Sequence, residues 1–514
     1  MPRPPAQVIL FAVYPVLLLL GENIGEVSWA DILLPLAVSV GGALIAFAGL
    51  RLILRDRDRA AVLTTAGLIA VYSFGYVRDG LEPVGPSAGV VLAAYGLVGA
   101  ALAILLLWRP TGWSRVSRAL TVVGAILVAL ALVPVVSAAG AGAGGTTVRL
   151  DIGAATRQTD RDIYYIILDR YASEHAARTY YQVEDPYLYG RLPELGFTVI
   201  PDSGANYPRT LLSMASSLNV SYLDELVVGQ GPNQLVQQPY VDLLQDHAVG
   251  RFLKAQGYTY VHVGSWWDAT KSSPIADVNP RFEGFSDFQA TLADTTIFPE
   301  IATRLRRLGL PLGGAPAESG RRHYEAGRFG LEMLDDVAAV SGPKFVLLHI
   351  LLPHEPFVFD RDGSFVPLDE RRSRTRGENY ERQLAYTDAR IARFLESILA
   401  VPADRQPIVI LQADEGPFPV RYETERATFT WLDATPQELD EKFGILNAFF
   451  LPGDEAPSPY PGISPVNAFR LVLGGYFGVD LPLLPDRHYV FRDRAHPLDL
   501  IDVTERVRGV LAAH

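Results

Sequence analysis

The chain has 514 residues, of which 49% are hydrophobic and 20% are charged, and its formal net charge is −12. It contains no cysteine, which excludes a disulfide scaffold, a zinc–thiolate site, an iron–sulfur cluster and a cysteine nucleophile. A nucleic-acid binder needs a basic surface to neutralise phosphates, so the acidic balance argues against that class. Residues 1–148 carry a net charge of +2 and residues 149–514 carry −14. The sequence therefore predicts two parts of different character.

Five uncharged apolar runs follow one another in the first part, and each has at least 18 residues. A helix needs about 20 mostly apolar residues to cross the hydrocarbon core of a bilayer. We therefore expect a transmembrane domain of five helices over residues 1–138, and a linker rich in small residues over 139–160. No run contains a charged residue or a histidine, which argues against an ion or proton path. The runs cover residues 4–21, 32–50, 60–77, 83–108 and 119–148.

The arginines indicate how this domain is oriented, because cytoplasmic loops of membrane proteins are rich in arginine and lysine. Four arginines lie between the second and third runs and three lie between the fourth and fifth, whereas the other two loops together hold one. The first run resembles a signal peptide but lacks a small-residue cleavage site, which predicts an uncleaved anchor. We expect a multi-pass plasma (inner) membrane protein with a cytoplasmic N-terminus and everything after residue 148 outside. The loop arginines are Arg51, Arg55, Arg57, Arg59, Arg109, Arg115 and Arg118.

The second part alternates between short apolar runs and segments with helical periodicity. The clearest helix covers Glu378–Leu399, where apolar residues fall on one face. Strands separated by helices predict an α/β domain over residues 161–514, with a mostly parallel central sheet and helices on both faces. In such sheets ligands bind at the carboxyl ends of the strands. The predicted strands are Asp162–Leu168, Tyr258–Val263, Phe345–Ile350, Ile408–Leu411 and Ile445–Leu451.

Carboxylates follow two of these strands directly. Asp169 ends the first strand, and Asp414 and Glu415 follow the strand at Ile408–Leu411. Three negative charges at one sheet edge are costly unless a cation lies between them. Together with the Thr210 hydroxyl they would form an all-oxygen shell suited to Mg²⁺, Mn²⁺ or Ca²⁺. For a single Asp, a helix cap or a surface position is the better interpretation, but the set favours a metal site.

Thr210 begins a predicted helix over Thr210–Leu218, where unpaired amides favour negative charge and so favour a nucleophile. A helix cap is the structural alternative. The Arg209 guanidinium would bind an anionic oxygen through two hydrogen bonds, or it would be an ordinary solvated side chain. His354, in a strand-exit loop, is better placed for substrate contact, acid catalysis or a second metal than His349, which lies inside an apolar strand. Trp266 and its neighbour Trp267 would line a pocket for a sugar or lipid headgroup, or pack the domain.

These motifs, in this order, resemble the alkaline phosphatase/sulfatase superfamily. They are most similar to its membrane-anchored bacterial branch, which includes lipoteichoic acid synthase and the phosphoethanolamine transferases. Members of that branch have five N-terminal spans and an outward-facing catalytic domain. The resemblance therefore implies that residues 161–514 form an extracytoplasmic sulfatase-like catalytic domain. The motifs are Tyr164–Asp169, Asn206–Thr210, His349–Phe357, Gln412–Gly416 and Phe443–Gly453.

The resemblance also implies roles for single residues. Asp169 is similar to the acidic metal ligand after the first strand, and Thr210 to the nucleophile that becomes phosphorylated. Asp414 matches the first half of an Asp-His metal pair. His349 or His354 corresponds to the histidine that contacts the transferred group or its leaving oxygen.

Two departures from the family pattern bear on the chemistry. Glu415 stands where the family has histidine, which shifts the expected metal from Zn²⁺ towards Mn²⁺ or Mg²⁺, or signals a weakened or lost site. Sulfatases depend on a formylglycine made from Cys or Ser, and this chain has Thr210 at the matching place. Phosphorus chemistry is therefore favoured over sulfate-ester hydrolysis.

The sequence thus predicts a membrane-anchored, metal-dependent phosphotransferase or phosphodiesterase that acts on an extracytoplasmic phospholipid or glycan. Thr210 would be the nucleophile, and Asp169, Thr210, Asp414 and Glu415 would hold the metal. Arg209, His349, His354 and Trp266 would contact the substrate. The alternative is a catalytically inert sulfatase-like protein that serves as a binding or scaffolding component of envelope assembly, and Glu415 is the residue that favours it.

Overall fold

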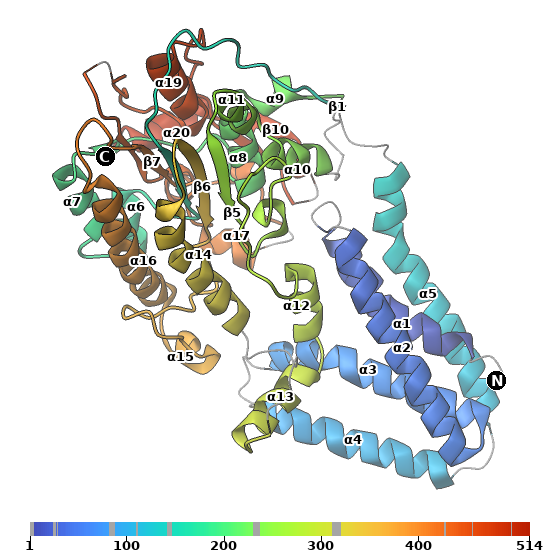
Figure 1. Cartoon of the computed structure of the whole chain (residues 1–514). Coiled ribbons are helices and arrows are strands. Elements are labelled where there is room, and N and C mark those ends of the chain that lie inside the picture. Colours follow the sequence, from blue (N-terminus) through green and yellow to red (C-terminus); the bar gives the residue numbers. More distant parts are fainter. Residues whose placement is uncertain are drawn as a thin grey trace. The chain divides into compact units, whose positions relative to one another are not determined.

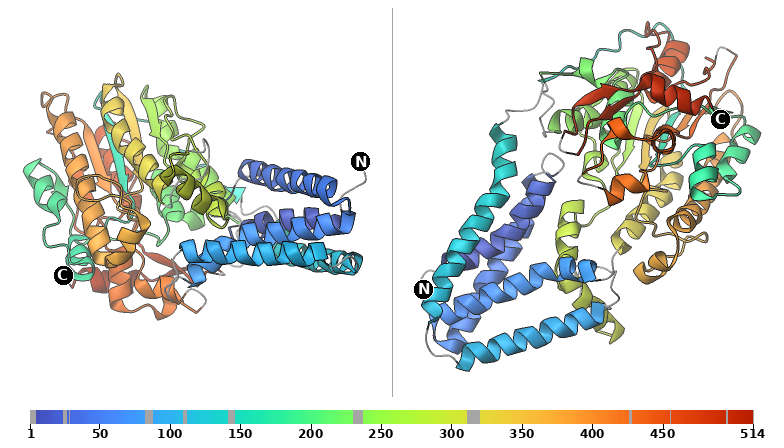
Figure 2. Two further views of the ribbon diagram at one scale, coloured as in Figure 1. Left: turned by 90° about the horizontal axis from the view of Figure 1, so that it is seen from below. Right: turned by 180° about the vertical axis from the view of Figure 1, so that it is seen from behind.

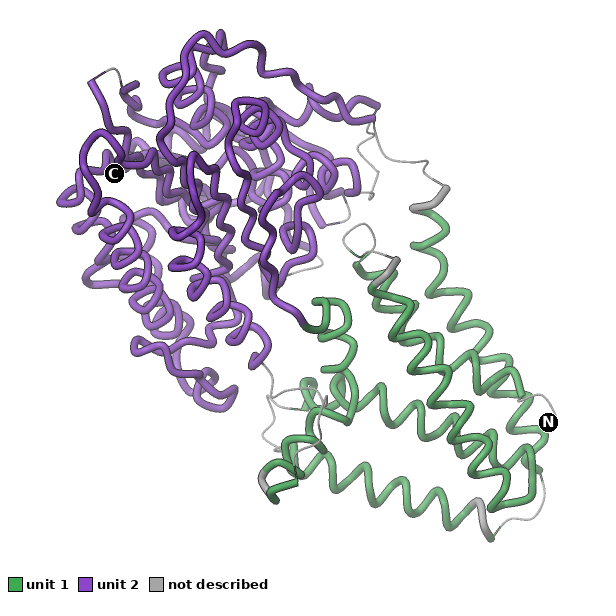
Figure 3. Tube along the Cα trace, viewed as in Figure 1, with its two compact units in different colours: residues 1–142, 284–319 green, residues 143–283, 320–514 purple. Residues whose placement is uncertain are grey.

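The computed structural model of the chain forms two compact units, which are coloured separately in Figure 3. Unit 1 contains residues 1–142 and 284–319, and unit 2 contains residues 143–283 and 320–514. The predicted catalytic domain, 161–514, thus includes a segment that belongs to unit 1. The structure describes residues 5–23, 27, 29–81, 88–108, 112–140, 146–229, 237–310, 320–425, 428–454, 456–494 and 496–513. Residues 141–145 of the predicted linker lie outside this part of the chain.

The N-terminal part of unit 1 is built from helices joined by short connections (Figure 1). Five helices occupy the five predicted runs, but four of the described helices are long and apolar enough to cross a membrane, one fewer than predicted. The exception is the first, which has 17 residues, follows Pro5 and ends at Glu22. The helices are α1 (Ala6–Glu22), α2 (Trp29–Leu54), α3 (Arg57–Leu81), α4 (Ala88–Trp108) and α5 (Trp113–Gly140).

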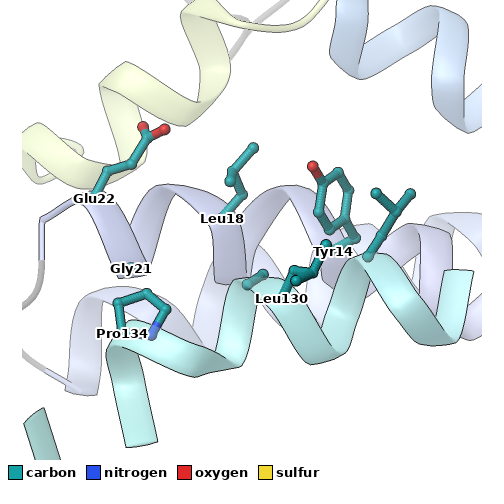
Figure 4. Close-up of a pocket in the computed structure, with 8 residues that line it drawn as sticks. Tyr14, Leu18, Gly21, Glu22, Leu130 and Pro134 are labelled. Carbon is teal, nitrogen blue, oxygen red and sulfur yellow. The ribbon is translucent and has the colours of Figure 1, made fainter. Parts of the chain in front are cut away.

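A cavity of about 210 Å³ lies between α1 and α5 (Figure 4). Tyr14 and Leu18 of α1 and Leu130 of α5 line it, and Glu22 and Pro134 lie towards one end. Gly21 lets the two helices approach at this end, because a Cβ there would lie 2.7 Å from the Pro134 ring. The cavity lining is therefore mostly apolar and contains one carboxylate.

Two further helices complete unit 1, although they come from the later part of the chain. They are α12 (Asp287–Asp294) and α13 (Phe298–Arg307). Phe288 and Leu292 of α12 are buried in one cluster with Leu19, Leu20 and Ile32 of the N-terminal helices. Residues 284–310 therefore pack within unit 1, separated in sequence from its other helices by the first strands of unit 2.

Unit 2 is built on a six-stranded sheet with the order β3-β8-β7-β2-β6-β5. Four neighbouring strands, β7, β2, β6 and β5, run parallel, and β8 runs antiparallel to both β7 and β3. The sheet is thus mixed and mostly parallel, as the strand–helix alternation predicts. The strands are β2 (Ile163–Leu168), β3 (Thr198–Val199), β5 (Thr259–Val263), β6 (Lys344–Ile350), β7 (Ile408–Gln412) and β8 (Asn447–Phe450).

Helices cover both faces of this sheet (Figure 2). The central strand β2 is buried throughout because its alternate residues enter two different cores. Tyr164, Ile166 and Leu168 pack in the first core, whereas Ile163, Tyr165 and Ile167 pack in the second. This double burial explains why the strand is apolar at every position.

The first core is covered by α6 (Glu174–Tyr181), α7 (Tyr187–Glu194), α14 (Arg321–Ala339), α16 (Arg376–Leu399), α17 (Val420–Thr424), α18 (Pro436–Phe443) and α20 (Thr504–Leu511). The second core is covered by α8 (Thr210–Leu218), α9 (Leu223–Leu226), α10 (Gln238–Gln245), α11 (Ala248–Ala255) and α19 (Pro465–Phe477). The remaining elements are α15 (Leu368–Ser373), the 3₁₀ turns Asp268–Thr270 and Trp431–Asp433, and two small antiparallel pairs. The pairs are β1 (Thr146–Thr147) with β4 (Val227–Val228), and β9 (Tyr489–Phe491) with β10 (Leu500–Asp502).

Candidate metal and catalytic site

The carboxyl ends of three neighbouring strands, β7, β2 and β6, bring the candidate residues to one edge of the sheet. Ile167 of the central strand pairs with His349 on one side and with Gln412 on the other. Asp169 therefore leaves the middle strand two residues beyond the level of His349 and of Gln412, beside the residues that follow Gln412. The backbone N–H of Asp169 donates to the carbonyl of Ile350 at 3.0 Å, which fixes the exit of the chain from β2.

Asp169, His349 and Asp414 form a cluster that could hold a metal ion. Each offers one ligand atom, and these atoms all lie within 4.8 Å of one another. The His349 Nε2 atom is 3.7 Å from the Asp169 Oδ2 atom. All three residues are buried, with no more than 4% of their surface exposed. Two of the three carboxylates expected to bind metal, Asp169 and Asp414, are thus brought together, and His349 joins them from the neighbouring strand.

Several polar atoms of this cluster have no hydrogen-bond partner among the described residues. They are Asp169 Oδ1, both side-chain oxygens of Asp414, Glu415 Oε2 and His349 Nε2. A buried polar group without a partner costs about 1–3 kcal/mol, and a charged group costs more. Five such atoms in one place are therefore expensive unless a further group satisfies them. Oxygens and an imidazole nitrogen are suitable ligands for a divalent cation, so these residues fit a metal ion.

The electrostatics of the cluster point the same way. Burial raises the pKa of Asp169 well above its usual value, and the neighbouring Asp414 raises it further. Burial followed by the charge of Glu415 raises the pKa of Asp414. Burial also lowers the pKa of His349 to about 3, which keeps its imidazole neutral. A neutral imidazole and two carboxyls that resist ionisation together would all be stabilised as ligands by a bound cation.

Thr210 lies beside this cluster as the first residue of α8. The Thr210 hydroxyl lies close enough to the Asp414 carboxyl to lower its pKa, although without the geometry of a hydrogen bond, and burial and Glu415 together raise that pKa more. Ser213, one turn further along α8, donates its hydroxyl to the Asp414 carbonyl at 2.7 Å and so holds the helix against the loop after β7. Arg209 caps no backbone group of the helix with its side chain. The Thr210 hydroxyl therefore lies at a helix N-terminus and next to a candidate metal ligand.

Glu415 has a partner that the sequence did not suggest. The ammonium group of Lys442, on α18, lies 2.9 Å from Glu415 Oε1 and also donates to the Gly416 carbonyl at 2.7 Å. Lys442 is fully buried, and burial lowers its pKa despite the attraction of Glu415. The Arg170 Nε atom lies 3.6 Å from the same oxygen. One oxygen of Glu415 is therefore neutralised by the protein, and only the other lacks a hydrogen-bond partner among the described residues.

His349 is oriented by a residue from a distant loop. Its Nδ1 atom lies 2.9 Å from the hydroxyl of Thr270. The Thr270 hydroxyl is also 2.7 Å from the Ser265 hydroxyl, and the Thr270 carbonyl pairs with His262 Nε2 at 2.9 Å. This buried network fixes the ring so that Nε2 points at Asp169. Histidines that bind metals are commonly oriented in this way through their other nitrogen.

The other residues predicted to contact substrate are His354, Trp266 and Arg209, which are not members of the Asp169–His349–Asp414 cluster. His354 Nδ1 is bonded to the Glu355 carbonyl, so this nitrogen is the donor and Nε2 is the basic one. Burial, and next the charge of Arg170, lower the pKa of His354 well below its usual value. The Trp266 ring packs edge-on to His354, with 5.9 Å between ring centroids. The Arg209 guanidinium lies over the Phe491 ring at 5.9 Å.

Three residues of this region were not predicted from the sequence: Arg170, Thr270 and Lys442. Arg170 directly follows Asp169 in the chain, and this adjacency was an available signal. Thr270 and Lys442 have no such signal, because they come from a turn after β5 and from the end of α18 and meet the cluster only in the folded domain. They contribute a hydrogen bond and a charge that the motifs alone do not contain.

Comparison with known proteins gave no match to a family model and none to a curated protein sequence. Solved structures do match. The integral membrane protein lipooligosaccharide phosphoethanolamine transferase A from Neisseria meningitidis is 12% identical, with 92% of this chain and 95% of that chain covered and a TM-score of 0.41. The C-terminal periplasmic domain of EcEptC from Escherichia coli is 13% identical, covering 70% of this chain and 97% of that chain at a TM-score of 0.39.

A 2-O GAG sulfatase also matches, at 11% identity and a TM-score of 0.38, over 63% of this chain and 72% of that chain. A phosphoethanolamine transferase and a sulfatase are thus among the similar structures, and the sequence motifs resemble the same groups. A likeness at this level transfers no residue role and no substrate. Roles for the residues of this chain therefore rest on their own contacts and chemistry.

Proposed function

We propose that this chain is a membrane-anchored, metal-dependent phosphotransferase or phosphodiesterase with Thr210 as its nucleophile. The observation that carries the proposal is the group of five buried polar atoms without hydrogen-bond partners among the described residues. They lie around Asp169, His349 and Asp414, whose ligand atoms fall within 4.8 Å of one another. A hydroxyl at a helix N-terminus lies beside this group. Unpartnered buried polar atoms destabilise a core that has only a structural role. Metal-assisted phosphoryl transfer, in contrast, needs a cation and a nucleophile side by side.

Asp169, His349 and Asp414 would hold the metal, and the unpartnered oxygen of Glu415 is a further candidate. When bound, the ion would supply positive charge to the phosphoryl oxygens and lower the pKa of a nearby hydroxyl. The predicted shell contained only oxygens and favoured Mn²⁺ or Mg²⁺. The imidazole of His349 adds a nitrogen ligand, which suits Mn²⁺ or Zn²⁺.

The reaction would proceed in two displacements. In the first, the Thr210 oxygen attacks the phosphorus of a phosphodiester, a phosphorus–oxygen bond to Thr210 forms, and the bond to the leaving alcohol breaks. The hydroxyl proton of Thr210 passes to the adjacent Asp414 carboxylate, and the leaving alkoxide takes a proton from solvent. In the second, an acceptor hydroxyl or water attacks the phosphorus and gives its proton to solvent. Thr210 then leaves and recovers its proton from Asp414.

The membrane part would place this chemistry on the outer side of the plasma (inner) membrane. Four described helices are long and apolar enough to span a bilayer, and the arginine-rich loops after α2 and α4 would face the cytoplasm. In this arrangement α2 and α4 would begin outside, and α3 and α5 would end there. A cytoplasmic N-terminus would also require the 17-residue helix α1 to cross the bilayer. A substrate that is a phospholipid, or a glycan on the membrane surface, agrees with this position.

The proposal is tested on the full-length chain in lipid nanodiscs. We expect stoichiometric uptake of Mn²⁺ or Zn²⁺ by metal analysis, and turnover of a chromogenic phosphodiester that requires the ion. We also expect a phosphoryl adduct on the Thr210 peptide by mass spectrometry after a brief reaction. Thr210→Ala should lose both the adduct and turnover while still binding metal. Unchanged turnover in this variant would remove Thr210 from the mechanism.

A second candidate is a binding component of envelope assembly that needs no metal. The observation in its favour is Lys442, a built-in cation 2.9 Å from the carboxylate that replaces the usual histidine. An ammonium group at this point satisfies part of the negative charge without an ion. Absence of metal uptake under added Mn²⁺, Mg²⁺ or Zn²⁺, with the fold intact by circular dichroism, would favour this candidate.

A further inference from the structure

A segment in the middle of the later part of the chain, residues 284–310, packs in unit 1. Its first helix, α12, begins with a capping box in which Ser286 and Gln289 satisfy each other's backbone N–H groups. Phe288 and Leu292 of α12 are then buried against Val16 and Leu20 of α1. These apolar contacts make the segment part of the helical unit rather than a surface loop of the α/β domain.

The contacts of this segment fall at particular ends of the N-terminal helices. The Gln289 side chain donates to the Asp31 carbonyl at the start of α2, at 3.3 Å. The backbone of α3 exchanges two bonds with the turn after α12: Gly75 donates to the Thr295 carbonyl at 2.9 Å, and Ile297 donates to the Val71 carbonyl at 3.1 Å. Under the orientation proposed above, all these contacts lie in the outward-facing halves of α1, α2 and α3.

The approach to α3 requires a glycine. A Cβ atom on Gly75 would lie 2.6 Å from the Asp294 carbonyl and 2.7 Å from the Thr295 Cα atom. Both neighbours are backbone atoms and cannot turn away as a side chain can. A Cβ atom on Gly67, on the same helix, would meet no described atom within 4 Å beyond its own stretch of helix. The close contact is therefore specific to the place where the segment docks.

The second helix of the segment, α13, has two distinct faces. Its apolar residues recur every three or four positions, and charged or polar residues occupy the opposite side. Ala302 is buried, whereas Phe298 is 53% exposed and Leu308, directly after the helix, is 74% exposed. Leu310 is 60% exposed. The apolar residues are Phe298, Ile301, Ala302, Leu305 and Leu308, and the polar ones are Glu300, Thr303, Arg304 and Arg306.

We propose that α13 lies in the outer interface of the bilayer and binds the surface of anionic phospholipids. Phe298, Leu308 and Leu310 would enter the boundary between headgroups and acyl chains. Helices with an apolar face and an arginine-rich polar face bind membranes in this way. The position fits because α12, the preceding helix, packs against α1 and α2 at the ends that face outward under the orientation proposed above. The leaflet follows from the proposed orientation, but the inference does not depend on any catalytic role.

The charge of the segment supports an anionic partner. Residues 298–307 contain three arginines and one glutamate, a net charge of +2, within a part of the chain that carries −14. The Arg304 Nε atom lies 2.9 Å from Glu300 Oε1, and the Arg304 side chain is 45% exposed. Basic residues near a membrane surface are attracted by anionic lipids. The helix would therefore give an otherwise acidic part of the chain a basic contact with a negatively charged membrane.

The absence of cysteine in the chain makes a direct test simple, because any introduced cysteine is unique. Phe298→Cys and Leu308→Cys, each labelled with a fluorophore, are compared with Glu505→Cys on an exposed position of α20. The full-length protein is placed in phosphatidylcholine vesicles that carry a nitroxide on the acyl chain near the glycerol. We expect the first two probes to lose fluorescence about twofold or more relative to the Glu505 probe.

Quenching at residues 298 and 308 that equals quenching at residue 505 would overturn the proposal, and it would do so whether or not the protein has phosphotransferase activity. Quenching that disappears as protein density in the vesicle rises would show that a second copy covers the helix, and would overturn it as well. Addition of phosphatidylglycerol should increase quenching at both sites. An unchanged value would overturn the part of the proposal that assigns anionic headgroups to the arginines.

Discussion

Two regions of unit 2 bury carboxylates, and they differ in how the carboxylates are satisfied. Asp388, on α16, is 1% exposed and accepts a hydrogen bond from the Tyr171 hydroxyl at 2.9 Å and one from the Leu188 backbone at 3.4 Å. Asp414 is 4% exposed, and neither of its side-chain oxygens has a hydrogen-bond partner among the described residues.

Burial raises the pKa of both groups. Burial and a perturbed pKa therefore do not separate a structural carboxylate from a functional one. The separation comes from the partners: Asp388 has hydrogen-bond donors within the fold, whereas the unpartnered atoms around Asp414 would be satisfied by the cation that we propose. Four changes to the protein test this difference.

The largest effect is expected from Lys442→Met, which removes the cation that neutralises Glu415. A buried charge left without its partner costs about 3–5 kcal/mol, so we expect a marked fall in the melting temperature of the full-length protein. The double variant Glu415→Gln with Lys442→Met should recover most of the loss, because no charge is then left alone. Equal melting temperatures for the wild type and Lys442→Met would show that the pair does not stabilise the cluster.

The next effect separates the two carboxylates directly. Asp414→Asn should weaken metal binding about 100-fold or more, since loss of a residue that merely orients a ligand already costs 10–100-fold. In the protein without metal, the same variant should melt at a higher temperature than wild type above neutral pH, because it removes a repulsive charge. Asp388→Asn is the matched control and should bind metal as the wild type does. Metal loss in both variants would remove the distinction between the two carboxylates.

A smaller effect is expected from Thr270→Val, which removes the hydrogen bond to His349 Nδ1 and keeps the shape of the side chain. We expect metal affinity to fall about tenfold, measured by competition with a chelating dye. Thr270→Ser retains the hydroxyl and should restore affinity. If valine and serine behave alike, the ring of His349 does not need this bond.

The last effect concerns the pH dependence of stability. Burial raises the pKa of Asp388 to about 7 from an ordinary value of 3.8, so the folded state holds this proton more tightly than the unfolded state does. Its contribution to stability is therefore full below about pH 4 and is lost as the pH rises towards 7, with a slope of at most about 1.4 kcal/mol per pH unit. Asp388→Asn does not titrate.

The difference in melting temperature between wild type and Asp388→Asn should therefore fall from pH 5 to pH 7.5. A constant difference would show that Asp388 is ionised throughout this range.

Much of the fold follows from the sequence, because it rests on local patterns. The apolar runs mark β2, β6 and β7, and residues that end parallel strands meet at one edge, so the approach of Asp169 to Asp414 was predictable. The start of the helix at Thr210 was also predicted from the local sequence. By contrast, β8 pairs antiparallel with β7, and no local signal distinguishes the direction of one apolar strand.

The details that decide the chemistry depend on long-range contacts. His349 was expected to contact substrate, and its apolar strand gave no reason to group it with Asp169 and Asp414. Lys442 reaches Glu415 from a helix that precedes β8, and Thr270 reaches His349 from a turn 79 residues away along the chain. The docking of residues 284–310 in unit 1 was equally hidden, because the amphipathic pattern of α13 is common in globular domains.

The assignment of residues 284–319 to unit 1 determines which truncated forms of the protein can be soluble. Cleavage at the end of α5 would release a fragment that still carries Phe288 and Leu292, and these side chains would then lack the helices that cover them. Such a fragment should aggregate or bind detergent. A soluble, monodisperse catalytic fragment would also require a short polar linker from residue 283 to residue 320 in place of residues 284–319.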